Sequence, residues 1–382
     1  MEEKLRYPDL DVEQFWKDDA IAQKDNCFYE GAPQVAFGVG LWDEDVFAEL
    51  NVPGDPMGEN PPELMREYRC RYNDKAEKII GKRPLSEELR NDQKFPKIRL
   101  HGEVFGGEYV YKSGMYWLES DIKTPQALEK MLDRVEKMNR REFILPANWE
   151  SEKKRIFEET GERPWPYFYG RRVRGPVTLA MSIYGVENTI FLMYDEPELA
   201  HRFFQAISDV LIGYIDITAQ EAGEALMQSR EWGYRFNDDN CCMLTPELYE
   251  EFAYPVLKRV FEYVCPDPQK NFRYQHSDSE MSHLLPILAR LDFSAVNFGP
   301  TVLLDKIRKH MPRTRVDGCL DPMLLLTNDE EAVIAQVRRD CEMAKALGTK
   351  GLRIDAAGSV NNGTKLTTVR AIMYAIQKYG RY

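Results

Sequence analysis

Three ligand-capable side chains follow one predicted strand, at the point where the chain turns toward the next segment. The stretch Phe272 to Met281 reads FRYQHSDSEM, so His276, Ser277 and Asp278 come directly after a short β-rich run. On an extended backbone His276 and Asp278, two residues apart, point the same way. Such a pair can bind a metal ion, or can act as a base with an orienting carboxylate.

Further polar residues stand at the ends of other predicted strands. Glu231 ends the strand expected before this one, and with His276 and Asp278 it makes a set suited to zinc or another borderline cation. A hydrogen-bonded polar cluster without metal explains these three residues equally well. We expect Asp317 to join them in catalysis. The residues expected to bind substrate are Arg171, Arg174, Asn297, Cys319 and Asp355, although Cys319 also fits a small residue packed behind a turn.

The elements that position these residues alternate between strand and helix over the second half of the chain. Strands are predicted at 224–231, 272–276, 293–298, 314–317 and 351–355, with helices at 279–291, 304–310, 330–347 and 367–378. This alternation predicts a parallel α/β architecture. A closed (β/α)8 barrel and an open sheet both fit the pattern. In a barrel the active site lies at the carboxyl ends of the strands.

The first part of the chain shows no sustained periodicity of apolar residues. Residues 1 to about 100 are expected to be irregular, apart from a helix near Pro62 to Ile80. A hairpin is predicted around Lys112-Ser113-Gly114, and Thr124-Pro125 predicts a helix start. We expect 1–160 to form an irregular α+β N-terminal extension that covers the substrate, and 161–382 to form the body of the fold, in one compact domain.

Composition limits the function classes. The net charge of −12, from 51 basic and 63 acidic residues, disfavours a nucleic-acid binder. Seven cysteines without CxxC spacing favour a reducing compartment, and the polar, acidic N-terminus lacks the apolar core of a signal peptide. No apolar run approaches membrane-spanning length. These features predict a cytoplasmic protein that binds neither membrane nor nucleic acid. The dinucleotide, P-loop, zincin and serine-hydrolase motifs are absent from the sequence.

Four stretches resemble the uroporphyrinogen decarboxylase superfamily in their order and spacing. They read GRRVRGPVTLAMSIYG, LTPELYEEFAYPVLKRVFEYV, VDGCLDP and GLRIDAAGSVNNGTKLTTVRAI, and the resemblance covers roughly residues 100 to 382. It implies the (β/α)8 TIM barrel. The N-terminal Arg-Gln-Ala-Gly-Arg run of the true decarboxylases is missing here. The resemblance therefore favours the corrinoid-dependent methyltransferase branch.

Within that branch, many members hold zinc with a His-x-Cys pair and a further Cys. This chain instead has His276-x-Asp278, and Asp355-Ala356-Ala357-Gly358 without a Cys in the last loop. A carboxylate is a harder metal ligand than a thiolate. The resemblance therefore implies a substrate that reacts at an oxygen atom, as in the aromatic O-demethylase methyltransferases. A zinc pattern associated with those enzymes gives an alternative ligand set, formed by Glu247, Glu262 and His283.

The resemblance thus implies transfer of a methyl group from a phenyl methyl ether to cob(I)alamin on a partner corrinoid protein. Zinc at His276, Asp278 and Glu231 would stabilise charge on the ether oxygen. Three alternatives stay open. These are another methyl donor, a cofactor-free decarboxylase and a barrel that only binds a ligand.

Overall fold

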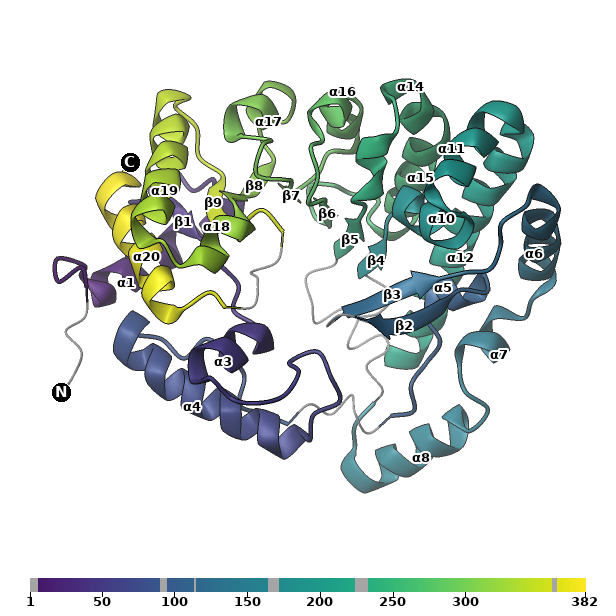
Figure 1. Ribbon diagram of the computed structural model, residues 1–382, viewed down its shortest axis with the longest axis horizontal. Helices are drawn as coiled ribbons and strands as arrows, with labels where there is room; N and C mark the ends of the chain where they lie inside the picture. The colour runs from purple at the N-terminus through teal and green to yellow at the C-terminus, as the bar shows by residue number, and fades with distance from the viewer. Residues whose placement is uncertain (1–5, 90–94, 113–114, 164–171, 224–232, 359–362) are drawn as a thin grey trace. The chain divides into compact units, whose positions relative to one another are not determined.

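The computed structural model describes residues 6–89, 95–112, 115–163, 172–223, 233–358 and 363–382 (Figure 1). By internal contacts the chain divides into two compact units. The first unit comprises 1–89, 277–282 and 294–382, and the second comprises 90–276 and 283–293. The division into a 1–160 extension and a 161–382 body stays a prediction. It states that the extension covers the substrate, and the division by internal contacts does not address that role.

Three parallel strands form the sheet of the second unit: β4 (Arg172–Arg174), β5 (Gly233–Asn237) and β6 (Phe272–His276). Alternate residues of β5 face opposite sides of the sheet. Tyr234 and Phe236 are buried and pack against Phe261, with ring centroids 6.2 and 5.3 Å apart. The opposite side of β5 therefore carries Arg235 and Asn237.

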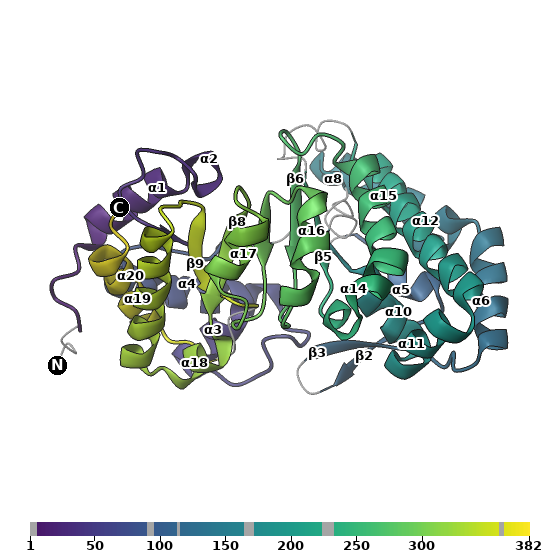
Figure 2. The ribbon, with the colours of Figure 1, turned by 90° about the horizontal axis from the view of Figure 1, so that it is seen from above.

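The helices of the second unit begin with clear sequence signals. In α6 the Thr124 hydroxyl accepts from Ala127 N–H at 3.2 Å, and Pro125 opens the first turn, as predicted. Figure 2 shows α12 and α15 side by side. The helices are α5 (His101–Val104), α6 (Pro125–Lys137), α7 (Arg140–Ile144), α8 (Trp149–Thr160), α10 (Pro176–Tyr184), α11 (Val186–Asp195), α12 (Pro197–Ala222), α14 (Pro246–Leu248), α15 (Tyr254–Val264) and α16 (Leu285–Leu288).

A two-stranded antiparallel hairpin also belongs to the second unit. Its strands are β2 (Glu108–Lys112) and β3 (Met115–Glu119), which confirms the predicted hairpin. Tyr109 lies opposite Leu118 in its register. Because side chains alternate along a strand, these two residues share one face of the hairpin.

The described residues of the first unit form four strands in the order β1-β9-β8-β7. They are β1 (Ala36–Phe37), β7 (Ala295–Asn297), β8 (Arg315–Leu320) and β9 (Leu352–Ala356), and the neighbours pair in parallel. Within the second unit the strand order is β6-β5-β4. The alternation of strands and helices thus builds the parallel α/β sheet that the sequence predicts.

Helices of the first unit flank β8 and β9. In Figures 1 and 2, α19 and α20 run side by side, and α19 contacts both strands. No helix in the described part of the chain has the length and apolar character that crossing a membrane requires. The helices are α1 (Val12–Ala22), α2 (Lys24–Cys27), α3 (Asp43–Leu50), α4 (Pro62–Ile80), α17 (Leu304–His310), α18 (Pro322–Thr327), α19 (Glu330–Ala346) and α20 (Leu366–Tyr379).

Two expectations about elements were wrong. The helix predicted over 279–291 is broken into short 3-10 turns around α16, because Pro286 has no N–H to donate within a longer helix. The described residues between 6 and 100 are not irregular. They hold three helices of eight residues or more, α1, α3 and α4, and β1 pairs with β9, so this region contributes to the sheet of the first unit.

Candidate functional site

Two neighbouring strand ends of the second unit carry a carboxylate and an imidazole. Asn237 at the end of β5 lies opposite His276 at the end of β6. The pairing extends one residue further, since Asp238 N–H donates to the His276 carbonyl at 2.9 Å. The next residue along the chain, Asp239, is thereby held near the His276 side chain.

Three side chains gather at this place. Asp239, His276 and Asp278 each offer one ligand atom, and these atoms lie within 4.8 Å of one another. We call these three side chains the histidine–carboxylate cluster. His276 is nearly buried, whereas Asp278, two residues further along the chain, is exposed. Among the described residues no other group of three such side chains comes this close together.

The donor atoms of the cluster suit a metal ion. One imidazole and two carboxylates are ligands that zinc accepts, and three protein ligands leave a coordination position open. Ligands about 2 Å from zinc lie at most about 4 Å apart, so atoms within 4.8 Å need little adjustment. The cluster contains no thiolate, which fits a borderline cation with oxygen and nitrogen ligands.

Two of the predicted site residues, Glu231 and Arg171, lie outside the described residues. The strand expected over 224–231 also falls entirely outside them, and the described strand β5 begins later, at Gly233. Its end therefore presents Asp238-Asp239, and Asp239 takes the position that the prediction gave to Glu231. The signal was available in the sequence, because GYRFN is a β-rich run that ends in two aspartates.

Asp238 joins the end of β5 to helix α10. One of its carboxylate oxygens accepts from Thr178 N–H at 2.7 Å, in the first turn of that helix. Burial raises the pKa of Asp238 to about 7. The residue is fully buried, so it fixes the backbone that leads to Asp239 rather than facing solvent.

Polar side chains occupy the face of β4, β5 and β6 that does not face Phe261. Arg174 lies opposite Asn237, which lies opposite His276, so the three form one row across the strand ends. Arg235 donates through Nε to Asn237 Oδ1 at 2.7 Å and lies over the Tyr274 ring, 4.8 Å from its centroid. The structure thus brings the predicted residue Arg174 onto the same row as His276.

In the first unit, Asp317 and Asp355 belong to an ion-pair network. Asp317 is buried and lies 2.7 Å from Arg315 Nε and 3.0 Å from Arg353 Nε. Arg353 also reaches Asp355 at 3.2 Å. Burial raises the pKa of Asp355 to about 7, although the charge of Arg353 acts in the opposite direction. The catalytic role of Asp317 and substrate binding by Asp355 stay predictions.

Asn297 and Cys319 are engaged with the backbone of the first unit. The Asn297 amide donates to the Asp317 and Ala356 carbonyls at 2.6 and 2.8 Å, and its Oδ1 accepts from Gly358 N–H. Cys319 is buried with its thiol 3.7 Å from the Val302 carbonyl, and burial raises its pKa. These contacts favour positioning for Asn297 and packing for Cys319 over substrate binding.

The alternative ligand set is not brought together. Glu247 is exposed in the first turn of α14, and Glu262 is exposed on α15, 3.7 Å from Lys258. His283 Nε2 lies 3.0 Å from the Leu244 carbonyl. The three residues do not form one of the close ligand groups found among the described residues, because the two glutamates lie on solvent-facing helix surfaces.

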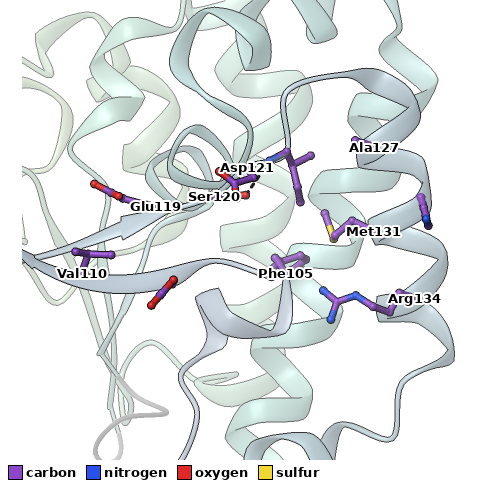
Figure 3. A pocket seen from close by; sticks show the side chains of 12 residues that line it. Phe105, Val110, Glu119, Ser120, Asp121, Ala127, Met131 and Arg134 are labelled. Carbon is purple, nitrogen blue, oxygen red and sulfur yellow. Dashed lines mark hydrogen bonds between the residues drawn. The ribbon is translucent and has the colours of Figure 1, made fainter.

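A pocket of about 630 Å³ lies between the hairpin and α6 in the second unit (Figure 3). Phe105 and Met131 form an apolar part of its lining, whereas Glu119, Asp121 and Arg134 add charge. None of the predicted site residues lines it. We therefore place the candidate chemistry at the histidine–carboxylate cluster, where ligand atoms converge, and not in this pocket.

Comparison with known proteins places the chain in a family. The sequence model of "Uroporphyrinogen decarboxylase (URO-D)" matches residues 172–379, which is more than half of the chain. The chain belongs to the uroporphyrinogen decarboxylase family. The matched residues begin at β4 and include β5 and β6, so the Asp239, His276 and Asp278 side chains lie within the family domain.

Curated relatives of the family carry two names. A uroporphyrinogen decarboxylase from Anaeromyxobacter dehalogenans is 26% identical over 214 residues, covering 54% of this chain and 58% of that protein. A methylated-thiol–coenzyme M methyltransferase from Methanosarcina mazei is 25% identical over 205 residues, covering 53% and 51%. The chain spans about half the length of the curated relatives that it matches.

A solved structure agrees with the fold. A methyltransferase from Methanosarcina mazei superposes with a TM-score of 0.56 at 13% identity, covering 91% of this chain and 94% of that one. With the family match and the parallel strands, this likeness confirms the predicted α/β TIM-barrel class. In TIM-barrel enzymes the catalytic groups come from the carboxyl ends of the strands.

Proposed function

We propose that the protein is a corrinoid-dependent methyltransferase that takes the methyl group from a phenyl methyl ether. The observation that carries this proposal is the histidine–carboxylate cluster, which gathers nitrogen and oxygen donors at the carboxyl ends of β5 and β6. The family match and the relative named as a methylated-thiol–coenzyme M methyltransferase support methyl transfer. The lack of a thiolate in the cluster supports an ether in place of a thiol.

In the proposed reaction the bond between the methyl carbon and the ether oxygen breaks. Cob(I)alamin, carried by a partner corrinoid protein, supplies the electron pair for the new bond to the methyl group. The electron pair of the broken bond stays on oxygen, and a phenolate leaves. The protein must therefore stabilise negative charge as it develops on that oxygen.

The cluster is suited to this task. Zinc held by Asp239, His276 and Asp278 would supply a Lewis acid for the ether oxygen. Two contacts position these ligands. The Asp238 hydrogen bond to α10 fixes the backbone that precedes Asp239, and the pairing of β5 with β6 fixes the backbone of His276. Nearly complete burial of His276 limits competition from water.

The reaction is tested by mixing the purified protein with reduced corrinoid protein and a panel of methoxylated aromatic compounds. We expect the absorption spectrum of methylcobalamin to appear, together with the matching phenol. Methyl transfer from methylated thiols alone would contradict the choice of an ether. Decarboxylation of uroporphyrinogen without methyl transfer would favour the decarboxylase alternative, which the names of several relatives support.

The metal site is tested by metal analysis of the purified protein and its variants. We expect about one zinc per chain, and a loss of at least 10-fold in zinc affinity in His276→Ala and Asp239→Asn. His283→Ala is the matched control, because that histidine belongs to the alternative set. Retention of zinc in His276→Ala, or its loss in His283→Ala, would overturn the proposed ligands.

A further inference from the structure

Asp278 of the histidine–carboxylate cluster lies in a short segment that is tied to the end of β7. Ser277 N–H donates to the Asn297 carbonyl at 2.9 Å, and Gly299 N–H donates to the Ser279 carbonyl at 3.2 Å. A Cβ at Gly299 would lie 2.6 Å from the Asp278 carbonyl oxygen, so the two backbones pack closely. All of these residues belong to the first unit. The backbone of Asp278 is therefore fixed by β7 and the residues that follow it.

These backbone contacts do not by themselves fix the direction of the Asp278 carboxylate. The side chain is exposed, and an exposed side chain can take several rotamers. A metal ligand binds best when it is already held in one rotamer, because a free side chain loses entropy on binding. One contact that restricts this carboxylate comes from Gly358, two residues after the end of β9.

Gly358 lies directly against the Asp278 carboxylate. A Cβ at position 358 would lie 2.6 Å from Asp278 Oδ1 and 3.0 Å from its Cγ, which is too close for non-bonded contact. Gly358 also has a φ of +110°, which glycine adopts without the strain that other residues would carry. The absence of a side chain at this position therefore makes the space that the carboxylate occupies.

The side chain of Asn297 fixes the backbone of Gly358. It is buried and reaches from β7 to the end of β9, where Oδ1 accepts from Gly358 N–H at 3.0 Å and Nδ2 donates to the Ala356 carbonyl at 2.8 Å. Nδ2 also donates to the Asp317 carbonyl of β8 at 2.6 Å. The same residue holds the segment of Asp278 through its backbone carbonyl. Asn297 thus contacts both the segment that carries the carboxylate and the loop that packs against it.

We propose that Asn297 and Gly358 are positioning residues that hold the Asp278 carboxylate ready to bind a metal ion at the histidine–carboxylate cluster. Asn297 fixes the loop after β9, and Gly358 closes one side of the space in which the carboxylate can turn. This inference rests on the proposed function, because it uses the metal site proposed there. It adds two residues that act through Asp278, without contact to the metal ion. In this proposal Asn297 positions a ligand and does not bind substrate.

The first test measures the affinity of the purified protein for Co²⁺ and records the visible absorption of the bound ion. Co²⁺ accepts the same kinds of ligand as zinc, and its spectrum reports the ligand set. Gly358→Ala should weaken binding by about 10- to 100-fold, the usual effect of losing a group that orients a ligand. Its spectrum should approach that of Asp278→Ala. Asn297→Ala should weaken binding by about 10-fold, and it adds no atom, so it carries the same test where Gly358→Ala does not fold.

The Asp278→Ala background separates positioning from a general loss of structure. Without the Asp278 carboxylate there is no ligand left to position, so adding Gly358→Ala or Asn297→Ala should change the Co²⁺ affinity by less than about 2-fold. The control in the parent protein is Gly348→Ala, because Gly348 also has a positive φ and a Cβ there would meet no atom within 4 Å. It should leave both the affinity and the spectrum unchanged.

Urea unfolding of the metal-free protein tests the contact itself. Gly358→Ala should lower the unfolding midpoint more in the parent than in Asp278→Ala, because the second background removes the atoms that the new Cβ would meet. Equal shifts in the two backgrounds would show that residue 358 does not press on the carboxylate, and would overturn the inference.

The Co²⁺ measurements also separate this inference from the proposed function. An unchanged affinity in both Gly358→Ala and Asn297→Ala, or an equal loss with and without the Asp278 carboxylate, overturns the positioning role. A parent protein that binds no metal ion overturns this role and the proposed ligands together. The expected losses of affinity, in a parent protein that transfers no methyl group from any methoxylated aromatic compound, would leave the positioning role standing and overturn the proposed function.

Discussion

At the scale of single residues, Asp45 shows how a buried carboxyl group makes stability depend on pH. It is fully buried in the first turn of α3, where one oxygen accepts from Trp42 N–H at 2.9 Å. The other oxygen has no partner among the described residues. Burial, aided by the charges of Glu44 and Glu49, raises the pKa of Asp45 to about 8.

Asp45→Asn should flatten the pH dependence of stability. The folded protein keeps the Asp45 proton up to about pH 8, whereas the unfolded chain loses it near its ordinary value of 3.8. The stability that this group contributes is therefore complete below pH 4 and is lost as the pH rises toward 8. Between pH 5 and 8 we expect the parent to lose on the order of 4 kcal/mol relative to the variant.

Urea unfolding followed by circular dichroism at pH 5 and pH 8 measures this difference. Asparagine keeps an oxygen that can accept from Trp42 N–H, so the cap survives in the variant. If both proteins lose the same stability between the two pH values, the carboxyl group is ionised in the folded state and the inference about Asp45 is wrong.

The candidate site was predictable from the sequence only in part. His276 and Asp278 were found because a histidine and a carboxylate after a strand are recognisable ligands. Asp239 was missed because the run GYRFN was not recognised as a strand, so the residues that follow it were not considered as ligands. The contact between Tyr109 and Arg174 joins distant parts of the chain, and local sequence pattern carries no information about such contacts.

At the scale of elements, the limits of several helices were predictable from the sequence. The helices over 62–80 and 304–310 have the predicted limits, and Thr124 caps α6 as expected. Short strands were harder, since β4 and β7 have three residues each and little periodicity. β1 has two residues, and only its pairing with β9 identifies it as part of the sheet.

Gly351→Ala should disrupt the entry into β9. Gly351 has a φ of +81°, and a Cβ there would lie 2.1 Å from the ring of Phe28. Its N–H also donates to the Cys27 carbonyl at 2.8 Å, so the backbone cannot move away without losing that bond. We expect a loss of about 3 kcal/mol in the free energy of unfolding, from backbone strain and steric overlap together.

Gly348→Ala is the matched control for this substitution. Gly348 also has a positive φ, of +58°, but a Cβ there would meet no atom within 4 Å. It should cost about 1 kcal/mol, the backbone contribution alone. Thermal unfolding of the two variants checks the difference, and equal losses would show that the Phe28 ring yields without cost.

At the scale of the whole chain, Arg370 ties its early part to its last helix. The guanidinium donates to the carbonyls of Arg6, Tyr7 and Ile79 at 2.9, 3.2 and 2.7 Å. All of these residues belong to the first unit. One side chain on α20 thus satisfies three backbone oxygens that lie more than 290 positions away in the sequence.

Arg370→Met should therefore weaken the first unit. The variant keeps the aliphatic stem and leaves three carbonyls without their donor, so we expect a loss of about 3 kcal/mol. Arg338→Met is the control, because Arg338 is exposed, pairs with Glu342 at the surface and lies over the Tyr379 ring. It should cost about 0.5 kcal/mol. Chemical denaturation compares the two, and similar midpoints would argue against the structural role of Arg370.

The hairpin that carries Tyr109 precedes the residues matched by the family, whereas Arg174 lies among them. The two partners of one hydrogen bond thus lie on either side of the point where the family match begins. The hairpin can change by mutation or recombination without any change in the barrel strands or in the ligands at their ends. Members of the family can therefore differ in this hairpin while they keep the strand ends that carry the histidine–carboxylate cluster.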